Sequence, residues 1–185
     1  MCYGVDHWKG DNHAEFYDES VYSSLSDYQN DNYSPFSKLL RMNFDDAAYG
    51  FEDNSIDLLH IDGLHTYDAV KHDFEIWLPK LSKNSVVLFH DTQVKEKDFG
   101  VWKLWEELSK QYPSIEFLHS YGLGVLKTGD HLKHLLFTLN NKELLFVQSF
   151  FRSIGTNLLL KFMISEDMSN FDYIQKQIIN NSDIF

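Results

Sequence analysis

The sequence predicts an α/β fold in which helices cover both faces of a largely parallel sheet. Two short apolar runs, at residues 56–61 and 86–89, are typical of buried strands in such a sheet. The segment between them, residues 66–82, is long enough for the crossover helix that parallel neighbours require. Strands alternate with helices along much of the chain, which indicates a sandwich of three layers.

The segments before this unit begin the alternation. A short apolar run ends at Asp6, and the loop after it contains Gly10. The predicted elements, in chain order, are a strand at 2–5, a loop at 7–17, a helix at 19–33, a strand at 38–42 and a helix at 45–51.

The segments from residue 66 onward complete the predicted sandwich. The crossover helix carries apolar residues at helical spacing, and Pro79 biases it to end near Leu78. A further helix follows, with Pro113 as its stop. Residues 115–119 and 124–127 predict a closing antiparallel pair. The apolar helix faces are Tyr67, Val70, Phe74, Trp77, Leu78 and Leu81 in the first helix, and Val101, Leu104, Trp105 and Leu108 in the second.

The character of the chain changes near Gly129. Residues 132–137 and 144–151 are strongly apolar and predict helices, and roughly the last thirty residues are richer in Asn, Ser and Asp. We therefore predict an α/β domain over residues 1–128 and a helical appendage or linker, weakly structured toward its end, over residues 129–185.

Composition excludes several classes of protein. The 185 residues carry a formal net charge of -12 without a Lys/Arg cluster, which argues against a nucleic-acid partner. The apolar runs are too short to span a bilayer, and the N-terminus lacks a signal pattern. The single cysteine, Cys2, cannot form an internal disulfide, which fits a reducing compartment. These features predict a soluble, cytoplasmic protein.

Acidic residues and histidines follow both buried runs at the point where each ends. The first run closes on Asp62 and His65, and the second on His90 and Asp91. In parallel sheets, ligands bind just beyond the carboxyl ends of the strands. We therefore expect these four side chains to converge on one small volume, which is the geometry of an active site.

Each of these residues has a functional and a plain interpretation. Adjacent strands lie about 5 Å apart, so Asp62 and Asp91 can share one divalent cation, or each can simply end its strand or cap a helix. His90 is either a third metal ligand or an ordinary hydrogen-bonded core histidine. Its place next to Asp91 predicts that it faces the other side of the strand, unless the strand end twists. His65 is either a general base that deprotonates a hydroxyl or a loop residue held by hydrogen bonds.

Other polar residues give weaker signals. His60 lies mid-strand and is predicted to be a core histidine, and Asp73 is predicted on a solvated helix face. Asp6 ends its strand where an acidic residue can accept hydrogen bonds from a ribose diol. Asp11 and His13 suggest a metal by their spacing, but a mobile substrate or cofactor loop explains them more economically. Nucleophile-elbow, phosphate-loop and paired-cysteine motifs are absent from the sequence.

Several of these motifs together resemble one known family. They are residues 3–11 (YGVDHWKGD), 56–67, 77–81 (WLPKL) and 86–92, continued by Gly100-Val101-Trp102 and Trp105-Glu106. From about residue 2 to residue 127 the chain is similar to class I S-adenosylmethionine-dependent methyltransferases. It is closest to the small domains attached to glycosyltransferases and other sugar-modifying enzymes of bacterial surface polysaccharides.

The resemblance implies roles for the predicted site residues. Asp6 would bind the ribose hydroxyls of S-adenosylmethionine, Asp45 would lie near the adenine, and Asp62 would serve both the cofactor and the metal side. In metal-dependent relatives, positions matching Asp62, His90 and Asp91 hold Mg or a similar ion against an acceptor hydroxyl. The metal would lower the hydroxyl's pKa, His65 could take the proton, and methyl transfer would then need mainly in-line positioning.

The chain also departs from this family. Such methyltransferases begin with a strand, a Gly-rich loop and a helix before the strand that ends at Asp6, and that first strand lies mid-sheet beside the strand ending at Asp62. Without it, two buried edges carry unpaired backbone groups. We expect either a fragment or a chain whose tail or second subunit fills the gap.

Three functions remain open on these grounds. The first is a metal-assisted O-methyltransferase acting on a sugar or similar hydroxyl acceptor, with a homo-oligomer or a fused or partner glycosyltransferase domain as its expected assembly. The second is a non-catalytic methyltransferase-like module of a glycosyltransferase system. The third is a metal-dependent hydrolase that uses the same strand-end cluster on water.

Overall fold

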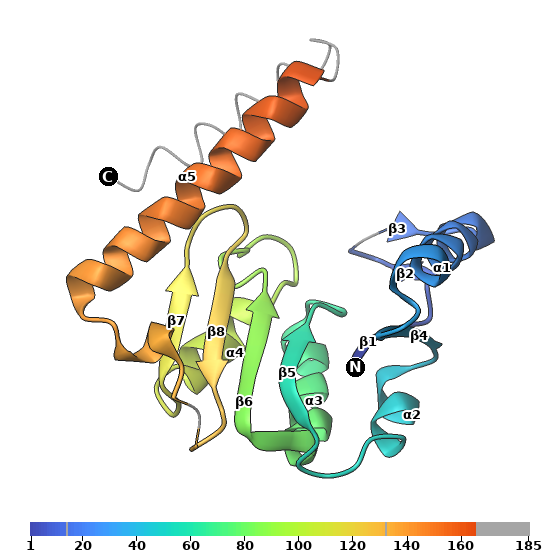
Figure 1. The fold of residues 1–185 in the computed structure, drawn as a ribbon, viewed down its shortest axis with the longest axis horizontal. Helices are drawn as coiled ribbons and strands as arrows, with labels where there is room; N and C mark the ends of the chain where they lie inside the picture. The colour runs from blue at the N-terminus through green and yellow to red at the C-terminus, as the bar shows by residue number, and fades with distance from the viewer. Residues whose placement is uncertain (14, 132, 166–185) are drawn as a thin grey trace.

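The computed structural model describes residues 1–13, 15–131 and 133–165 of the chain. Strands and helices alternate from α1 to α4, and a long helix ends the described part (Figure 1). The elements are β1 (Cys2–Asp6), β2 (Gly10–Asp11), β3 (Glu15–Phe16), α1 (Glu19–Tyr33), β4 (Ser37–Arg41), α2 (Phe44–Tyr49), β5 (Ile56–Ile61), α3 (Tyr67–Trp77), η1 (Leu78–Lys80), β6 (Leu81–His90), α4 (Val101–Leu108), β7 (Ser114–Phe117), β8 (Leu123–Lys127), η2 (Leu135–Thr138) and α5 (Asn141–Ser165).

The longer strands form two separate hydrogen-bonded sheets that together make the β-layer of the fold. β1 pairs in parallel with β4, while the larger part has the order β5-β6-β8-β7, with β5 and β6 parallel and β8 antiparallel to both of its neighbours. Among the described residues, no strand pairs with the remaining edges of β1 and β5. The sheet is therefore interrupted between β1 and β5, where the sequence resemblance places a missing strand. The mixed α/β class predicted from the sequence is confirmed.

Side-chain packing on one face joins the two parts. Val5 of β1 and Leu59 of β5 lie in one cluster with Trp77 of α3 and the small residues Ala47 and Ala48 of α2. The tight approach of α2 to α3 depends on those two alanines, which are buried. As a result, the ends of β1 and β5 keep a fixed relation although their backbones are not paired.

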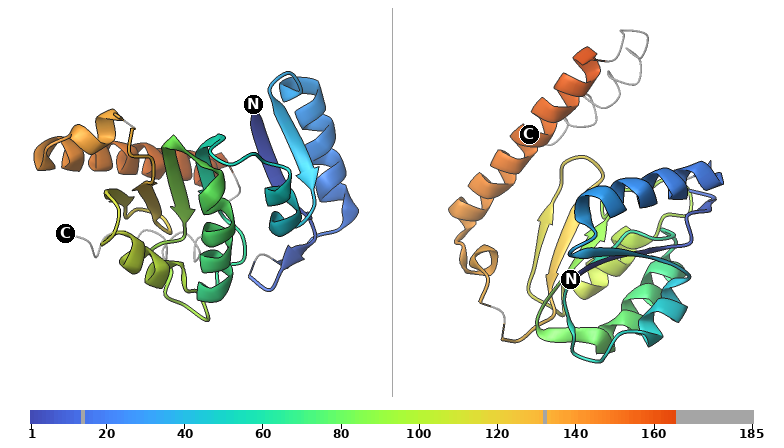
Figure 2. Two further views of the ribbon diagram at one scale, coloured as in Figure 1. Left: turned by 90° about the horizontal axis from the view of Figure 1, so that it is seen from below. Right: turned by 45° about the vertical axis from the view of Figure 1, so that its right-hand side comes forward.

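The larger core lies between the four-stranded sheet and the helices α3 and α4 (Figure 2). Phe89 of β6 is its most central aromatic residue, with ring centroids 5.7 Å from Phe74 of α3 and 6.0 Å from Trp105 of α4. Gly124 of β8 makes room for Trp105, since a Cβ there would lie 2.5 Å from the indole ring. Together these contacts fix β6, the strand that carries His90.

Helix α5 lies on the opposite face, over β7 and β8. The Phe151 ring is 5.7 Å from Phe117, and the Gln148 side chain donates a hydrogen bond of 2.7 Å to the backbone carbonyl of Glu116. The prediction of a helical appendage is confirmed for this segment. The suggestion that the tail fills the gap is wrong for the described residues, because α5 packs at the other end of the sheet (Figure 1). The domain boundary near Gly129 stays a prediction, and residues 166–185 lie outside the described part.

Several predicted details differ from the structure. The strand predicted at 86–89 begins at Leu81, and the segment predicted as a helix at 132–137 has a 3-10 helix at Leu135–Thr138 instead. His60 is exposed rather than buried, because it points to the face of β5 that no helix covers, beside Leu58, which is 62% exposed. In the described ranges, no helix is long and apolar enough to cross a membrane.

Candidate functional site

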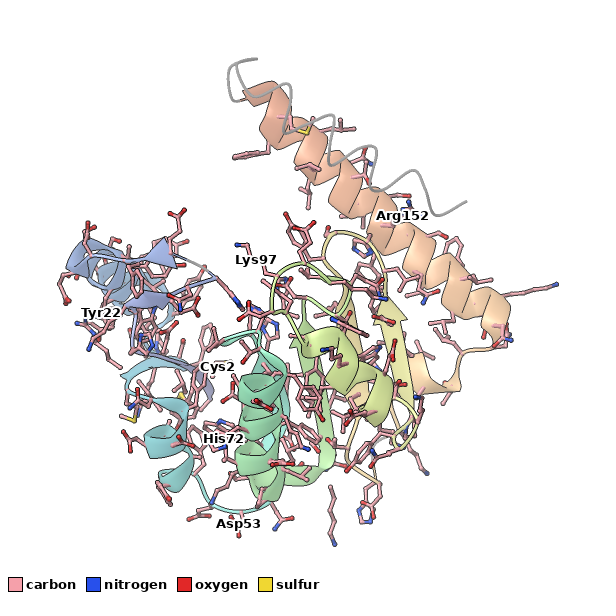
Figure 3. All side chains as sticks on the ribbon, turned by 180° about the vertical axis from the view of Figure 1, so that it is seen from behind. Cys2, Tyr22, Asp53, His72, Lys97 and Arg152 are labelled. Carbon is pink, nitrogen blue, oxygen red and sulfur yellow. The ribbon has the colours of Figure 1, made fainter. Side chains whose placement is uncertain are left out.

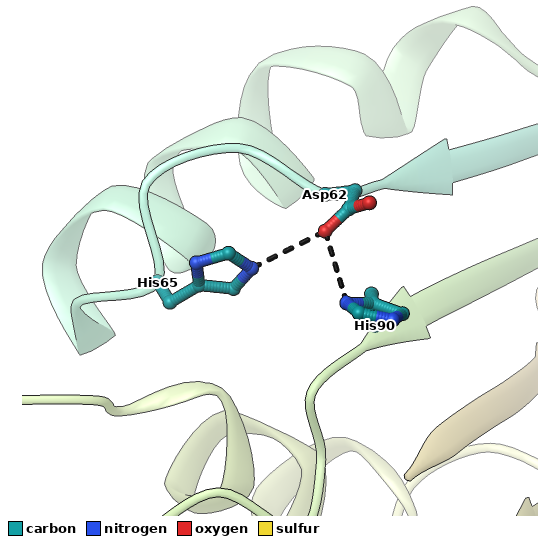
Figure 4. Close-up of side chains that lie close together, drawn as sticks. All are labelled: Asp62, His65 and His90. Atoms are coloured by element: carbon teal, nitrogen blue, oxygen red, sulfur yellow. Dashed lines mark hydrogen bonds and ion pairs between the residues drawn. The ribbon is translucent and has the colours of Figure 1, made fainter. Parts of the chain in front are cut away.

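The four residues predicted to converge at the strand ends do so. Asp62 Oδ1 lies 3.2 Å from His65 Nε2 and 3.1 Å from His90 Nδ1. Asp91 closes the group from the other side, with Oδ2 3.3 Å from His65 Nε2 and Oδ1 2.9 Å from His90 Nδ1. Figure 4 shows both imidazoles directed at the Asp62 carboxylate from two sides. Two carboxylates and two imidazoles thus share one small volume at the carboxyl ends of β5 and β6.

A local change of backbone direction brings His90 and Asp91 to the same site. Successive strand residues point to opposite faces, but Asp91 leaves β6 with φ at +60°, a conformation that Asp tolerates better than most residues. Its N–H donates to the carbonyl of Gly122, which has φ at +89° and no room for a Cβ beside Thr92 Oγ1. The sequence left open regular alternation of His90 and Asp91 or a twisted strand end, and the structure has the twisted strand end, which makes the cluster.

Charge in the cluster is strongly coupled. The Asp62 and Asp91 carboxylates raise the pKa of His90 to about 10. In return, the hydrogen bond with His65 and then the ion pair with His90 hold the pKa of Asp62 well below its usual range. The two carboxylates therefore hold a cation at this point, and in the absence of a metal that cation is the proton on His90.

The donor atoms of the cluster fit a divalent cation. Asp62, His65 and His90 offer ligand atoms that all lie within 4.8 Å of one another. His90 Nδ1 and Asp91 Oδ1 are buried and not aligned for a hydrogen bond in spite of their short separation. A buried polar atom without a hydrogen-bond partner lowers the stability of the folded protein, so a group of such atoms indicates a ligand-binding site. Across the described residues, all such side-chain atoms belong to His13, His65, His90, Asp91 and Thr92.

An aromatic wall borders the cluster, and sequence reasoning did not find it. The Phe99 ring stacks on His65, with centroids 5.1 Å apart, and on His13, with centroids 4.4 Å apart. His13 Nε2 lies 2.7 Å from Asp98 Oδ1. His13 had a weak signal in the sequence and Phe99 had none, because residues 93–99 form an irregular loop. Only tertiary contact brings this loop to the N-terminal hairpin.

Of the three predicted cofactor residues, Asp62 belongs to the cluster, and Asp6 and Asp45 lie outside it. Asp6, at the end of β1, accepts a hydrogen bond of 2.7 Å from the Trp8 N–H. Asp45, in the first turn of α2, is exposed and pairs with His72 Nε2 at 2.7 Å. The neighbouring Phe44 ring packs against Gly63, so the start of α2 borders the loop that carries Asp62. The roles of Asp6 and Asp45 in cofactor binding stay predictions.

Asp73 of α3 is buried rather than solvated as predicted. Its side chain turns toward Gly63, with Oδ2 3.1 Å from where a Cβ of that glycine would lie, and the residue is 8% exposed. Burial disfavours the charged form and raises the pKa of Asp73 to about 6. The folded protein therefore binds a proton here more tightly than the unfolded chain.

We expect Asp73→Asn to stabilise the protein at pH 8 by about 1–2 kcal/mol. In the wild type, stability falls as the pH rises from the ordinary carboxyl pKa to about 6, because the folded state holds the proton and the unfolded state does not. The gain should vanish near pH 4. Urea unfolding at both pH values measures it, with the exposed Glu75→Gln on the same helix as the control. An equal effect at both values would contradict burial as the cause.

Comparisons with known proteins bear on the fold and the family. Residues 1–92 match a protein-family model described as a methyltransferase domain. The protein named "Uncharacterized protein y4gI" of Sinorhizobium fredii (strain NBRC 101917 / NGR234) is 51% identical over 131 residues. This match covers 71% of the chain but 14% of that relative, so the chain spans only a small part of the relative's length.

A solved structure supports the fold. A crystal structure of a Corynebacterium glutamicum protein superimposes with a TM-score of 0.51 at 15% sequence identity, covering 71% of this chain and 62% of that one. At this identity the likeness concerns the fold alone. The fold and the family match thus point the same way along the first half of the chain.

Proposed function

We propose, because residues 1–92 match a methyltransferase domain within a Rossmann-like α/β fold, that the chain is the core of an S-adenosylmethionine-dependent O-methyltransferase assisted by a divalent cation. The observation that carries this proposal is the cluster of Asp62, His65, His90 and Asp91 at the carboxyl ends of β5 and β6. Ligands of such sheets bind at this edge.

The cofactor half of the proposed site lies at the ends of β1 and β4. One carboxylate oxygen of Asp6 accepts a hydrogen bond from the Trp8 N–H in the following loop, and this bond orients the carboxylate at the strand end. We assign to it the ribose hydroxyls, and to Asp45, at the start of α2, a place near the adenine. The packing of Phe44 on Gly63 sets this half directly beside the Asp62 loop.

The acceptor half uses the two carboxylates and two imidazoles. A divalent cation held by Asp62, His90 and Asp91 would lower the pKa of an acceptor hydroxyl. His65 would accept the hydroxyl proton at its imidazole, and the carboxylates 3.2 and 3.3 Å from Nε2 would stabilise the imidazolium that forms. Phe99 covers one face of His65, so the base keeps its orientation and is shielded from water.

The acceptor we propose is a sugar or similar hydroxyl compound of surface-polysaccharide synthesis in the cytoplasm. The motif resemblance supports this class. The much greater length of the Sinorhizobium relative supports a partner domain, which we propose to be a glycosyltransferase.

Titration calorimetry with S-adenosylmethionine, with and without Mg²⁺, tests the proposal. We expect binding by this chain or by a version extended upstream, and a loss of about tenfold in affinity in Asp6→Ala, because a ribose diol loses its charged acceptor. Asp57→Asn, an exposed change on β5 away from the cluster, serves as the control. Absence of binding by both forms would overturn the proposal.

One observation favours a second candidate function. The edges of β1 and β5 have no partner strand among the described residues, and the cofactor's methionine part would lie at that interruption. A chain that cannot bind the cofactor in either form would instead be an interaction module of a larger protein. The same calorimetric comparison separates the two functions.

A further inference from the structure

The β2–β3 hairpin reaches from the β1–β4 part of the sheet to the acceptor side of the site. Gly10 begins β2 with φ at +70°, and the Tyr17 N–H donates to the Lys9 carbonyl at the base of the hairpin. At its tip, the His13 N–H donates to Asp11 Oδ1 at 2.7 Å, which holds the backbone so that the imidazole points away from the hairpin. In Figure 3, the label Lys97 marks the loop after β6, which lies on the same side of the molecule as the hairpin.

The His13 side chain is buried in contacts with that loop. It is 5% exposed, although the second strand of the hairpin, β3, is exposed. One face lies on the Phe99 ring at an interplanar angle of 16°, and Nε2 meets the Asp98 carboxylate. The two residues of the pair are 85 positions apart in the sequence, so this contact fastens two distant segments.

The same contacts reach His65. Phe99 stacks on His65 at an interplanar angle of 11°, and the His13 and His65 rings are stacked with centroids 6.0 Å apart. His65 Nδ1 is buried and has no hydrogen-bond partner, so no polar contact at that nitrogen fixes the ring. Its orientation depends on the two carboxylates at Nε2 and on the aromatic rings beside it.

We propose that His13 is a positioning residue for His65. His13 pairs with Asp98 and stacks on Phe99, and these contacts hold the Phe99 ring in position. The rings of His13 and Phe99 in turn keep the His65 imidazole directed at Asp62 and Asp91 and shield it from solvent. The part of this inference that concerns catalysis rests on the proposed function, in which His65 is the base. The part that concerns the geometry of His65 does not.

Diethyl pyrocarbonate labelling, located residue by residue with tandem mass spectrometry, tests the geometry without any substrate. In His13→Ala we expect His65 to be labelled several times faster than in the wild type, because the ring loses its cover. His13→Phe keeps a stacking ring and should restore slow labelling of His65. His131→Ala removes an exposed histidine far from the hairpin and is the matched control, with circular dichroism confirming that every variant is folded.

Steady-state kinetics add a second readout that a purely structural role would not move. With a methyl acceptor, His13→Ala should lower kcat about tenfold while the affinity for S-adenosylmethionine stays unchanged, since a misplaced base affects the chemical step alone. Unchanged labelling of His65 in folded His13→Ala would overturn the inference. Faster labelling of His65 in His13→Ala, with no methyl transfer by the wild type, would support the positioning role and contradict the proposed function.

Discussion

Replacing Asp62 by Asn is expected to lower the affinity of the protein for Mn²⁺ by about a hundredfold, because the change removes a charged ligand and keeps the shape of the side chain. Asp62 is the one carboxylate whose single oxygen faces both imidazoles, at 3.2 and 3.1 Å. Methyl transfer should fall with the metal. Calorimetric titration of Mn²⁺ into both proteins measures the change.

A second measurement on the same variant needs no metal. Asp62 is the largest cause of the raised pKa of His90, so that pKa should fall from about 10 toward its ordinary value in Asp62→Asn. Nitrogen-15 NMR of the imidazole follows this titration. Asp57→Asn lies on the same strand and should change neither quantity. A His90 pKa that stays near 10 in Asp62→Asn, together with full Mn²⁺ affinity, would show that the cluster is held by something other than Asp62.

The strand ends were predictable from the sequence for a physical reason. An apolar run of strand length indicates where a strand stops, and parallel neighbours end at one edge of the sheet. The convergence of Asp62, His65, His90 and Asp91 could therefore be predicted from the sequence alone. The sequence left open the directions in which the His90 and Asp91 side chains face. They depend on the φ of one residue, Asp91, which a period of two along a strand does not encode.

The remaining differences come from tertiary context. His60 has the pattern of a core residue, but a strand is buried on both faces only when something covers each face, and nothing in the described part covers His60. Asp73 follows His72 on a helix whose polar residues are mostly exposed, and its burial follows from the approach of Gly63. Phe99 and Asp98 lie in an irregular loop, where neither hydrophobic period applies.

The largest loss of stability is expected from Phe89→Ala. Phe89 is 0% exposed and lies between the rings of Phe74 and Trp105. Its truncation removes buried apolar contacts and leaves a cavity that the surrounding sheet and helices cannot fill by relaxing. We expect a cost of about 3–5 kcal/mol in urea unfolding. Phe146→Ala on α5, where the side chain is 71% exposed, is the control and should cost less than about 1 kcal/mol.

The same variant tests whether the core also shapes the site. Phe89 directly precedes His90 and Asp91, and the backbone turn that brings those two side chains together begins where the Phe89 ring anchors β6. If the core holds that turn, folded Phe89→Ala should bind Mn²⁺ more weakly than the wild type, while Phe89→Leu, which fills most of the cavity, should recover both stability and binding. Full Mn²⁺ affinity in a folded but destabilised Phe89→Ala would mean that the turn at Asp91 and its hydrogen bond to Gly122 are sufficient to build the site.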